Sequence, residues 1–198
     1  MTVDVVTFGC RLNLHESDAI KHHAEAAGLS DVVVVNTCAV TNEAVSQARQ
    51  TIRKVFRERS KPVVVTGCAA QTDPEMFARM PEVARVIGNH DKLQAQTWVD
   101  SHSLLTASTD HASKIAVSDV MALSEADVRP LEGRDGRTRA FLQVQNGCDH
   151  RCTFCIIPFG RGNSRSVAPD AVIAQARRLI QQGFREIVLT GVDITSYG

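Results

Sequence analysis

Valine-rich runs that alternate with helix-like segments restrict the fold of this chain more than any other feature of its sequence. The runs lack the apolar–polar alternation of a half-exposed strand, a pattern typical of strands buried on both faces of a parallel sheet. A segment with helical periodicity follows each run, so the repetition indicates an open α/β domain. The four runs cover residues 3–8, 31–36, 62–67 and 84–88, and the helical segments cover residues 15–28, 41–59, 73–80 and 90–101.

The alternation ends at residue 101, and we predict that the chain has three parts. Residues 1–101 form the first domain. Residues 102–139 are dominated by Ser, Thr, Asp and Arg, which is typical of a linker. Residues 140–198 resume with a strand, a cysteine-rich loop, a helix and another strand. One such unit cannot close a hydrophobic core, so we expect residues 140–198 to be the truncated start of a second domain and the chain to be a fragment.

Composition narrows the cellular setting. The 22 basic residues balance the 22 acidic residues, which argues against a protein that is basic throughout but leaves local basic patches open. No apolar run approaches the ~18–20 residues that cross a bilayer, and the N-terminus lacks the pattern of a signal peptide. We therefore expect a cytoplasmic protein without a membrane partner. In that compartment the six cysteines favour metal binding or catalysis over disulfides.

The upstream cysteines share one position relative to the predicted strands. Cys10, Cys38 and Cys68 each follow the end of a valine-rich run. The carboxyl ends of parallel strands meet at one edge of the sheet, where ligands bind in open α/β folds. We therefore expect the fold to bring the three thiols together, although each one is also compatible with a small buried core residue.

The downstream cysteines form a tighter motif. Cys148, Cys152 and Cys155 have the spacing C-x3-C-x2-C and lie between a predicted strand and a helix. Thiolates suit zinc, copper(I) or iron–sulfur clusters, but structural zinc normally takes four closed ligands. A 4Fe–4S cluster also normally takes four cysteines. Three thiolates would therefore leave one iron open to a reactant.

This motif, with Phe154 before its last cysteine, resembles that of the radical S-adenosylmethionine enzymes. The segments TFGCRLNLHESD (7–18), NTCAVTNEA (36–44), TGCAAQTDPE (66–75) and GCDHRCTFCIIPFGRGNSRS (147–166) together resemble the methylthiotransferases of that class. NTCAVTNEAVSQARQ, GCAAQTDPE and VIGNHDK further resemble the branch that acts on N6-threonylcarbamoyladenosine at tRNA position 37.

The resemblance implies a fold and a set of cofactors. It implies a flavodoxin-like parallel sheet with helices on both faces, followed by the start of a partial (β/α) radical S-adenosylmethionine barrel. Cys148, Cys152 and Cys155 would hold one 4Fe–4S cluster, and Cys10, Cys38 and Cys68 would hold a second that carries the inserted sulfur. S-adenosylmethionine would supply both the methyl group and the radical that activates C2 of adenine.

The resemblance also implies an activity, methylthiolation of C2 of N6-threonylcarbamoyladenosine. Methylthiolation of isopentenyladenosine-37 or of a ribosomal-protein aspartate stays open within the family. A non-enzymatic zinc or nucleic-acid-binding module stays open outside it. The partners implied are the tRNA anticodon loop, an electron donor of the flavodoxin or ferredoxin type and a sulfur source. Because most of the barrel would be missing, we expect the fragment alone to be inactive, with the RNA-binding part also missing.

Five further residues are candidates, and none is assigned a catalytic role beyond the cluster ligands. Phe154, Gly191 and Asp193 are expected to bind S-adenosylmethionine, and Arg161 and Arg165 to contact substrate. Each of the first three has an ordinary alternative: a core aromatic, a turn glycine and a helix N-cap.

Basic residues also gather in the helical segment 41–59. Arg49, Arg53 and Arg57 recur every four residues there. This stripe is compatible with contacts to RNA phosphates and also with an ordinary solvated helix face.

Overall fold

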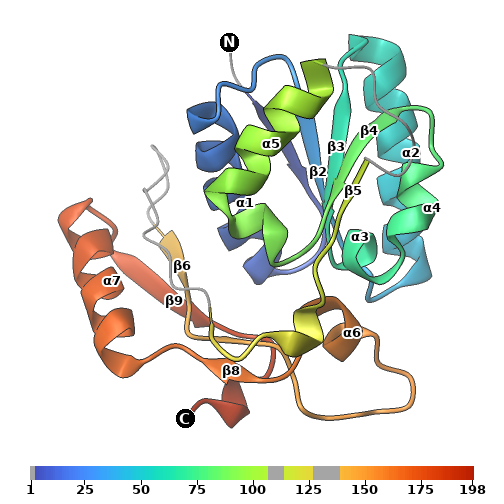
Figure 1. Ribbon diagram of the computed structural model, residues 1–198. Coiled ribbons are helices and arrows are strands. Elements are labelled where there is room, and N and C mark those ends of the chain that lie inside the picture. Colours follow the sequence, from blue (N-terminus) through green and yellow to red (C-terminus); the bar gives the residue numbers. More distant parts are fainter. Residues whose placement is uncertain (1–2, 107–113, 127–138) are drawn as a thin grey trace.

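A parallel sheet of five strands forms the centre of the N-terminal part of the chain, as Figure 1 shows. The computed structural model describes residues 3–106, 114–126 and 139–198. The strands follow the chain in the order β1-β2-β3-β4-β5, whereas the flavodoxin order is 2-1-3-4-5. Their bounds are β1 (Asp4–Thr7), β2 (Val33–Thr37), β3 (Val63–Gly67), β4 (Val83–Ile87) and β5 (Ile115–Ala116). The predicted α/β class with a parallel sheet is confirmed.

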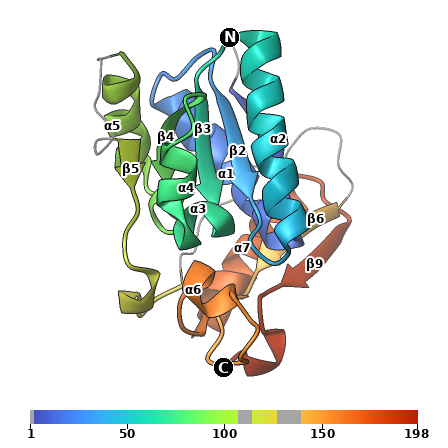
Figure 2. The ribbon, with the colours of Figure 1, turned by 90° about the vertical axis from the view of Figure 1, so that its right-hand side faces the viewer.

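Helices cover both faces of this sheet, which Figure 2 shows from the side. On one face lie α1 (Arg11–Ala26) and α5 (Ala95–Thr106), and on the other lie α2 (Asn42–Arg59), α3 (Cys68–Thr72) and α4 (Pro74–Ala78). A 3-10 turn, η1 (Asp91–Leu93), precedes α5.

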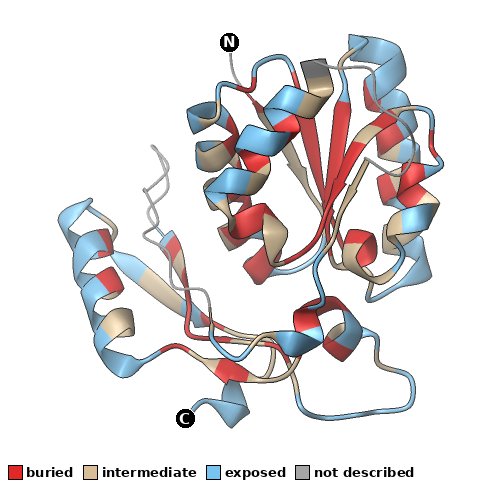
Figure 3. Ribbon diagram, viewed as in Figure 1, coloured by how far each residue is buried: buried red, intermediate tan, exposed pale blue. Residues whose placement is uncertain are grey.

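The valine runs are buried on both sides because their successive side chains enter two different cores. Val33 and Val35 pack with Ile52 and Phe77 in one core. Val34 packs with Trp98 in the other. A strand alternates its side chains between faces, so a run apolar at every position needs a layer of helices on each side. Figure 3 shows the central strands β2, β3 and β4 largely buried and the edge strands β1 and β5 at intermediate exposure.

The C-terminal part is a smaller β-α-β unit. Strands β6 (Arg139–Gln143) and β9 (Glu186–Thr190) pair in parallel, and α7 (Pro169–Gln181) packs against them. Its core of fully buried residues is small: Ala140, Leu142, Val144 and Leu179. This unit also has exposed apolar side chains, with Leu189 53% and Ile180 61% accessible.

A loop region connects β6 to α7 and carries the downstream cysteines. It contains a two-stranded antiparallel ribbon, β7 (Gln145–Asn146) with β8 (Arg165–Ser166), and the short helix α6 (Ile157–Arg161). The 3-10 turn η4 (Ile194–Ser196) follows β9.

The predicted linker, residues 102–139, contains regular secondary structure in its described part. Helix α5 extends to Thr106, β5 adds a fifth strand to the first sheet, and the 3-10 turn η3 (Val120–Ala122) follows. Residues 107–113 and 127–138 lie outside the described part of the chain. In the described part, no helix is both long enough and apolar enough to cross a membrane.

Candidate functional site

The upstream cysteines lie at the carboxyl edge of the first sheet, at the ends of three successive strands. Cys10 is the N-cap of α1, Cys38 follows β2, and Cys68 is the first residue of α3. Gly9 and Gly67 precede two of them with φ of +96° and +99°, a region that favours glycine. These backbone turns bring the chain from strand to helix abruptly, at the edge where the sequence places the thiols.

The three thiols lie close enough to influence one another. A Cβ added to Gly9 would lie 2.9 Å from Sγ of Cys38, so the Cys10 loop approaches Cys38 through a glycine. Burial raises the pKa of the Cys38 thiol, and the charges of Cys68 and Cys10 raise it further.

The placement and the chemistry of these three thiols indicate which metal group they could hold. Within the described residues, no three His, Cys, Asp or Glu side chains are placed to enclose a single metal ion. A 4Fe–4S cluster instead takes each thiolate at a different iron of one cube, and its ligands are thiolates. The soft, all-sulfur donor set of Cys10, Cys38 and Cys68 therefore fits a cluster better than a lone ion.

The downstream cysteines lie on one loop, and backbone and side-chain contacts fix its shape. The Cys148 N–H donates to the Gly162 carbonyl at 3.1 Å, and the Cys155 N–H to the Cys152 carbonyl at 3.0 Å. Asp149 accepts from the Ser164 N–H at 2.8 Å. Cys152 is exposed and the other two are partly exposed, so all three are free thiols near the surface of the described chain.

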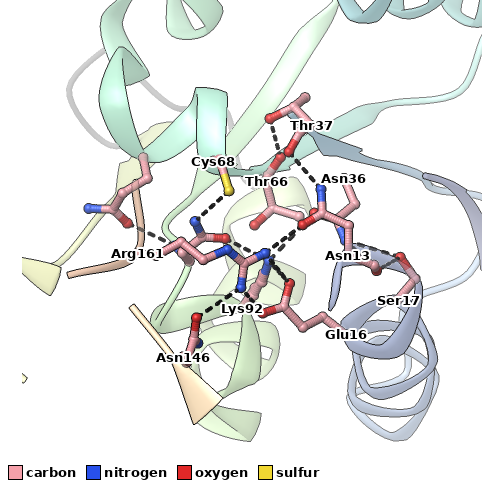
Figure 4. A network of polar contacts seen from close by, with 12 residues as sticks. Asn13, Glu16, Ser17, Asn36, Thr37, Thr66, Cys68, Lys92, Asn146 and Arg161 are labelled. Atoms are coloured by element: carbon pink, nitrogen blue, oxygen red, sulfur yellow. Dashed lines mark hydrogen bonds and ion pairs between the residues drawn. The ribbon is translucent and has the colours of Figure 1, made fainter. Parts of the chain in front are cut away.

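A buried group of charges lies between the two parts of the chain, as Figure 4 shows. Arg161, at the end of α6, donates to both carboxylate oxygens of Glu16 on α1, at 2.5 and 3.0 Å. The ammonium of Lys92 donates to the same carboxylate at 2.7 Å. The side chains of Arg161, Glu16 and Lys92 are only 3%, 2% and 0% exposed. Burial raises the pKa of Glu16, but the charges of Arg161 and Lys92 outweigh this and lower it to about 2.

Asparagines connect these charges to the cysteine edge. The amide oxygen of Asn89 accepts from Lys92 at 2.6 Å, and its nitrogen donates to Sγ of Cys68 at 3.4 Å. Asn13 accepts from Arg161 at 2.6 Å and donates to the carbonyls of Phe8 and Thr37. Asn89 thus reaches a cysteine sulfur, and Asn13 fixes the loops beside Cys10 and Cys38.

Gln145 joins the segments around the downstream loop. It is fully buried, and its side-chain oxygen accepts from the backbone N–H groups of Val192 and Asp193 at 2.9 and 2.8 Å. Its side-chain nitrogen donates to the Gly147 carbonyl at 2.7 Å. One side chain therefore ties the residue before Cys148 to the loop after β9.

The residues expected to bind S-adenosylmethionine lie around that junction. Gly191 approaches Gln145 so closely that an added Cβ would lie 2.9 Å from its Oε1. Asp193 accepts from the hydroxyls of Thr195 and Ser196, both at 2.7 Å, and lies 3.2 Å from Nε2 of His150 in the cysteine loop. Phe154 is 92% exposed, so it fills no core gap in the described chain. Cofactor binding by Phe154, Gly191 and Asp193 stays a prediction.

Cys10 and Gly191 line one open pocket of about 500 Å³. Leu12 and Leu14 of α1 face it from the first part of the chain, and Leu189 and Ile194 face it from the second. The structure therefore brings one upstream cysteine and the loop after β9 to a common cavity.

Arg161 and Arg165, the candidates for substrate contact, are both buried. Arg161 contacts Glu16, Asn13 and Asn146, and Arg165 donates to the carbonyls of Asn163 and Arg161 at 2.7 and 2.9 Å. These contacts are within the protein, so substrate contact by either arginine stays a prediction.

Sequence reasoning missed Glu16, Lys92, Asn89 and Gln145. Glu16 alone carried a usable signal. It falls on the helical stripe of α1 that also buries Leu12, Ile20 and Ala24, where a carboxylate needs a partner.

Two family models match separate parts of the chain. Residues 2–88 match the "Uncharacterized protein family UPF0004", and residues 142–198 match the "Radical SAM superfamily". The segment that matches UPF0004 thus carries the upstream cysteines, and the segment that matches the radical SAM superfamily carries the downstream cysteines.

Individual relatives are more specific. The chain is 48% identical over 98% of its length to "Threonylcarbamoyladenosine tRNA methylthiotransferase MtaB" of Rickettsia prowazekii. It is 37% identical over its whole length to the protein of that name in Bacillus subtilis. It is 30% identical over 98% of its length to "tRNA-2-methylthio-N(6)-dimethylallyladenosine synthase" of Pelagibacter ubique. The resemblance to the methylthiotransferases is confirmed, and the chain spans 44–45% of the length of these three relatives.

Proposed function

We propose that this chain is the cluster-binding part of a tRNA methylthiotransferase that modifies C2 of N6-threonylcarbamoyladenosine at position 37. One observation carries the proposal: Cys10 of the upstream trio and Gly191 in the loop after β9 line the same cavity. The names of the relatives with the highest identity above support the threonylcarbamoyladenosine substrate.

Each trio has a separate role in this proposal. Cys148, Cys152 and Cys155 hold one 4Fe–4S cluster, and Cys10, Cys38 and Cys68 hold the other. Clusters of this kind, when bound, supply the electron that cleaves S-adenosylmethionine and a site for the sulfur that is inserted. Gly191 and Asp193 bind S-adenosylmethionine beside the downstream loop, and Gln145 keeps both segments in place. Phe154, Arg161 and Arg165 stay as the remaining candidates for cofactor and substrate contact.

The proposal includes partners. A base at position 37 lies in a single-stranded loop, where an unstacked base can enter a pocket. The exposed side chains of Arg53 and Arg57 on α2 offer phosphate contacts, which would make tRNA affinity fall with salt. An electron donor of the flavodoxin or ferredoxin type and a sulfur source complete the reaction, and we place it in the cytoplasm.

Mass spectrometry of tRNA nucleosides tests the substrate. In a strain that lacks the gene, we expect the 2-methylthio form of N6-threonylcarbamoyladenosine to disappear and the unmodified nucleoside to accumulate. The wild-type gene should restore it, and Cys10→Ala or Cys152→Ala should not. Loss of methylthiolated isopentenyladenosine instead, or of a modified ribosomal-protein aspartate, would contradict the substrate and indicate the other branches.

Metal analysis after anaerobic reconstitution tests the clusters. We expect about eight irons and eight sulfides per chain, with roughly half lost when either trio is replaced by alanine. A colourless protein with stoichiometric zinc would contradict the proposal and favour a zinc module.

A further inference from the structure

The buried charges between the two parts of the chain do not balance. Arg161 and Lys92 are positive, and Glu16 is the carboxylate that both contact. The guanidinium of arginine does not lose its proton in proteins. The ammonium of Lys92 donates to three oxygens, those of Glu16, Asn89 and Asn36, at 2.7, 2.6 and 3.5 Å, as its charged form requires. The three side chains together carry one excess positive charge.

An excess charge in this position needs a partner. All three side chains are at least nine-tenths buried, and an uncompensated charge out of water is costly. The neighbouring amides of Asn13, Asn36 and Asn146 are neutral. His15 lies beside Glu16 and adds no negative charge in either protonation state.

The cysteine edge is where a negative charge would face this group. A Cβ added to Gly160, the residue before Arg161, would lie 3.3 Å from Cβ of Cys68, so the segment that carries Arg161 packs against this edge. Asn89 bridges Lys92 to Sγ of Cys68 by direct hydrogen bonds. Three thiolates around a cluster would supply anionic charge at this edge.

We propose that the excess positive charge of Arg161 and Lys92 over Glu16 is the counter-charge for the anionic metal–thiolate centre at Cys10, Cys38 and Cys68. It stabilises the reduced, more negative form of that centre and so raises its reduction potential. Arg161 comes from the second part of the chain, so the potential of the first centre depends on the docking of the second part. This inference rests on the cluster assigned above to the upstream trio.

The test measures the midpoint potential of the upstream centre alone. Cys148→Ala, Cys152→Ala and Cys155→Ala in the full chain remove the downstream site, and anaerobic reconstitution then loads the upstream trio. The potential is read by titration with dithionite, followed by visible absorbance and electron paramagnetic resonance. Iron content and circular dichroism check loading and folding.

The variants change the buried charge in both directions. Arg161→Gln and Lys92→Met each remove the excess, and we expect each to lower the potential. Glu16→Gln doubles the excess and should raise it. The double variant Glu16→Gln with Arg161→Gln keeps the excess at one charge, so its potential should stay near that of the parent. A purely structural role predicts no such return in the double variant.

Controls separate charge from other effects. Arg161→Lys keeps the charge, so its potential should stay near that of the parent. Arg177→Gln removes an exposed charge on α7 and should leave the potential unchanged. If Arg161→Gln fails to fold, Glu16→Gln and the double variant decide the question. If the upstream centre binds iron but its midpoint potential is the same in all the charge variants, this inference is wrong and the two-cluster proposal still stands. A parent without iron at the upstream trio would overturn the two-cluster proposal and, with it, this inference.

Discussion

At the scale of single residues, glycines set the backbone conformation just before three of the cysteines. Gly9, Gly67 and Gly147 each precede a cysteine and each has positive φ, between +76° and +99°. At Gly67 an added Cβ would lie 2.3 Å from the carbonyl oxygen of Thr37, on the neighbouring strand. Both the backbone conformation and the close approach therefore exclude a side chain at this position.

Gly67→Ala should accordingly destabilise the metal-free chain. We expect a loss on the order of 2 kcal/mol or more, because strain from φ adds to the clash with Thr37. Gly28→Ala is the matched control: its φ is +81°, but nothing lies within 4 Å of an added Cβ. It should lose only about 1 kcal/mol. Urea denaturation compares the two, and equal losses would refute the role of the Thr37 contact.

Glu16 makes the stability of the metal-free chain depend on pH. Its folded pKa is lowered from 4.5 to about 2, so protons bind more readily to the unfolded chain. The stabilisation is therefore fully present above about pH 4.5 and is lost as the pH falls toward about 2. The total is on the order of 3 kcal/mol.

Urea denaturation at several pH values measures this loss. Glu16→Gln should flatten the dependence between these pH values, and the exposed Glu43→Gln should leave it unchanged. An unaltered slope in Glu16→Gln would show that other carboxylates carry the acid sensitivity.

At the scale of elements, Gln145 holds together segments that are separate in the chain. Its side chain satisfies two backbone N–H groups after β9 and the Gly147 carbonyl before Cys148. The loop that would hold one cluster and the loop that would bind S-adenosylmethionine therefore share one support.

Gln145→Leu should loosen both loops. It leaves three backbone groups without their partner, the buried Gly147 carbonyl and the part-buried N–H groups of Val192 and Asp193. A buried unsatisfied group costs about 1–3 kcal/mol when no water replaces the partner. We expect faster hydrogen exchange at residues 146–148 and 191–193, measured by mass spectrometry. Gln143→Leu is the control on the adjacent strand, because the Nε2 of Gln143 is buried and has no hydrogen-bond partner among the residues that the structure describes. It should be neutral or mildly stabilising, and similar effects of both variants would refute the role of Gln145.

The elements also show how far the sequence could predict the structure. Each valine run forms a strand whose ends lie within a residue or two of those expected. Such runs are easy to recognise, because a strand that is apolar at every position must be buried on both faces of a sheet. The two-residue strand β5 was missed, since Ile115–Ala116 is too short to show periodicity. The cysteine positions followed from the strand ends. The contact between Glu16 and Lys92, which lie 76 positions apart, could not be predicted from the sequence. It depends on how separate elements pack together, and the periodicity of each element carries no information on that.

At the scale of the whole molecule, the two parts of the chain differ in how much they bury. The first has two cores, one on each face of its sheet. The second has one small core, and β9 leaves Leu189 largely exposed. Exposed apolar residues on a β-α-β unit are typical of a surface that other elements cover.

We therefore predict that the 198-residue chain does not cleave S-adenosylmethionine by itself. After anaerobic reconstitution and addition of dithionite, the yield of 5′-deoxyadenosine should equal that of a Cys152→Ala control. Turnover clearly above that control would show that the described β-α-β unit suffices for cleavage.

The ion pair between Arg161 and Glu16 couples sequence changes in one half of the chain to sequence changes in the other. Loss of Glu16 leaves the buried guanidinium without its carboxylate, and loss of Arg161 removes the donor that joins the halves. We therefore expect exchange of halves between relatives to depend on both positions. Chimeric proteins spliced between residues 126 and 139 should assemble well only when both parents share this pair.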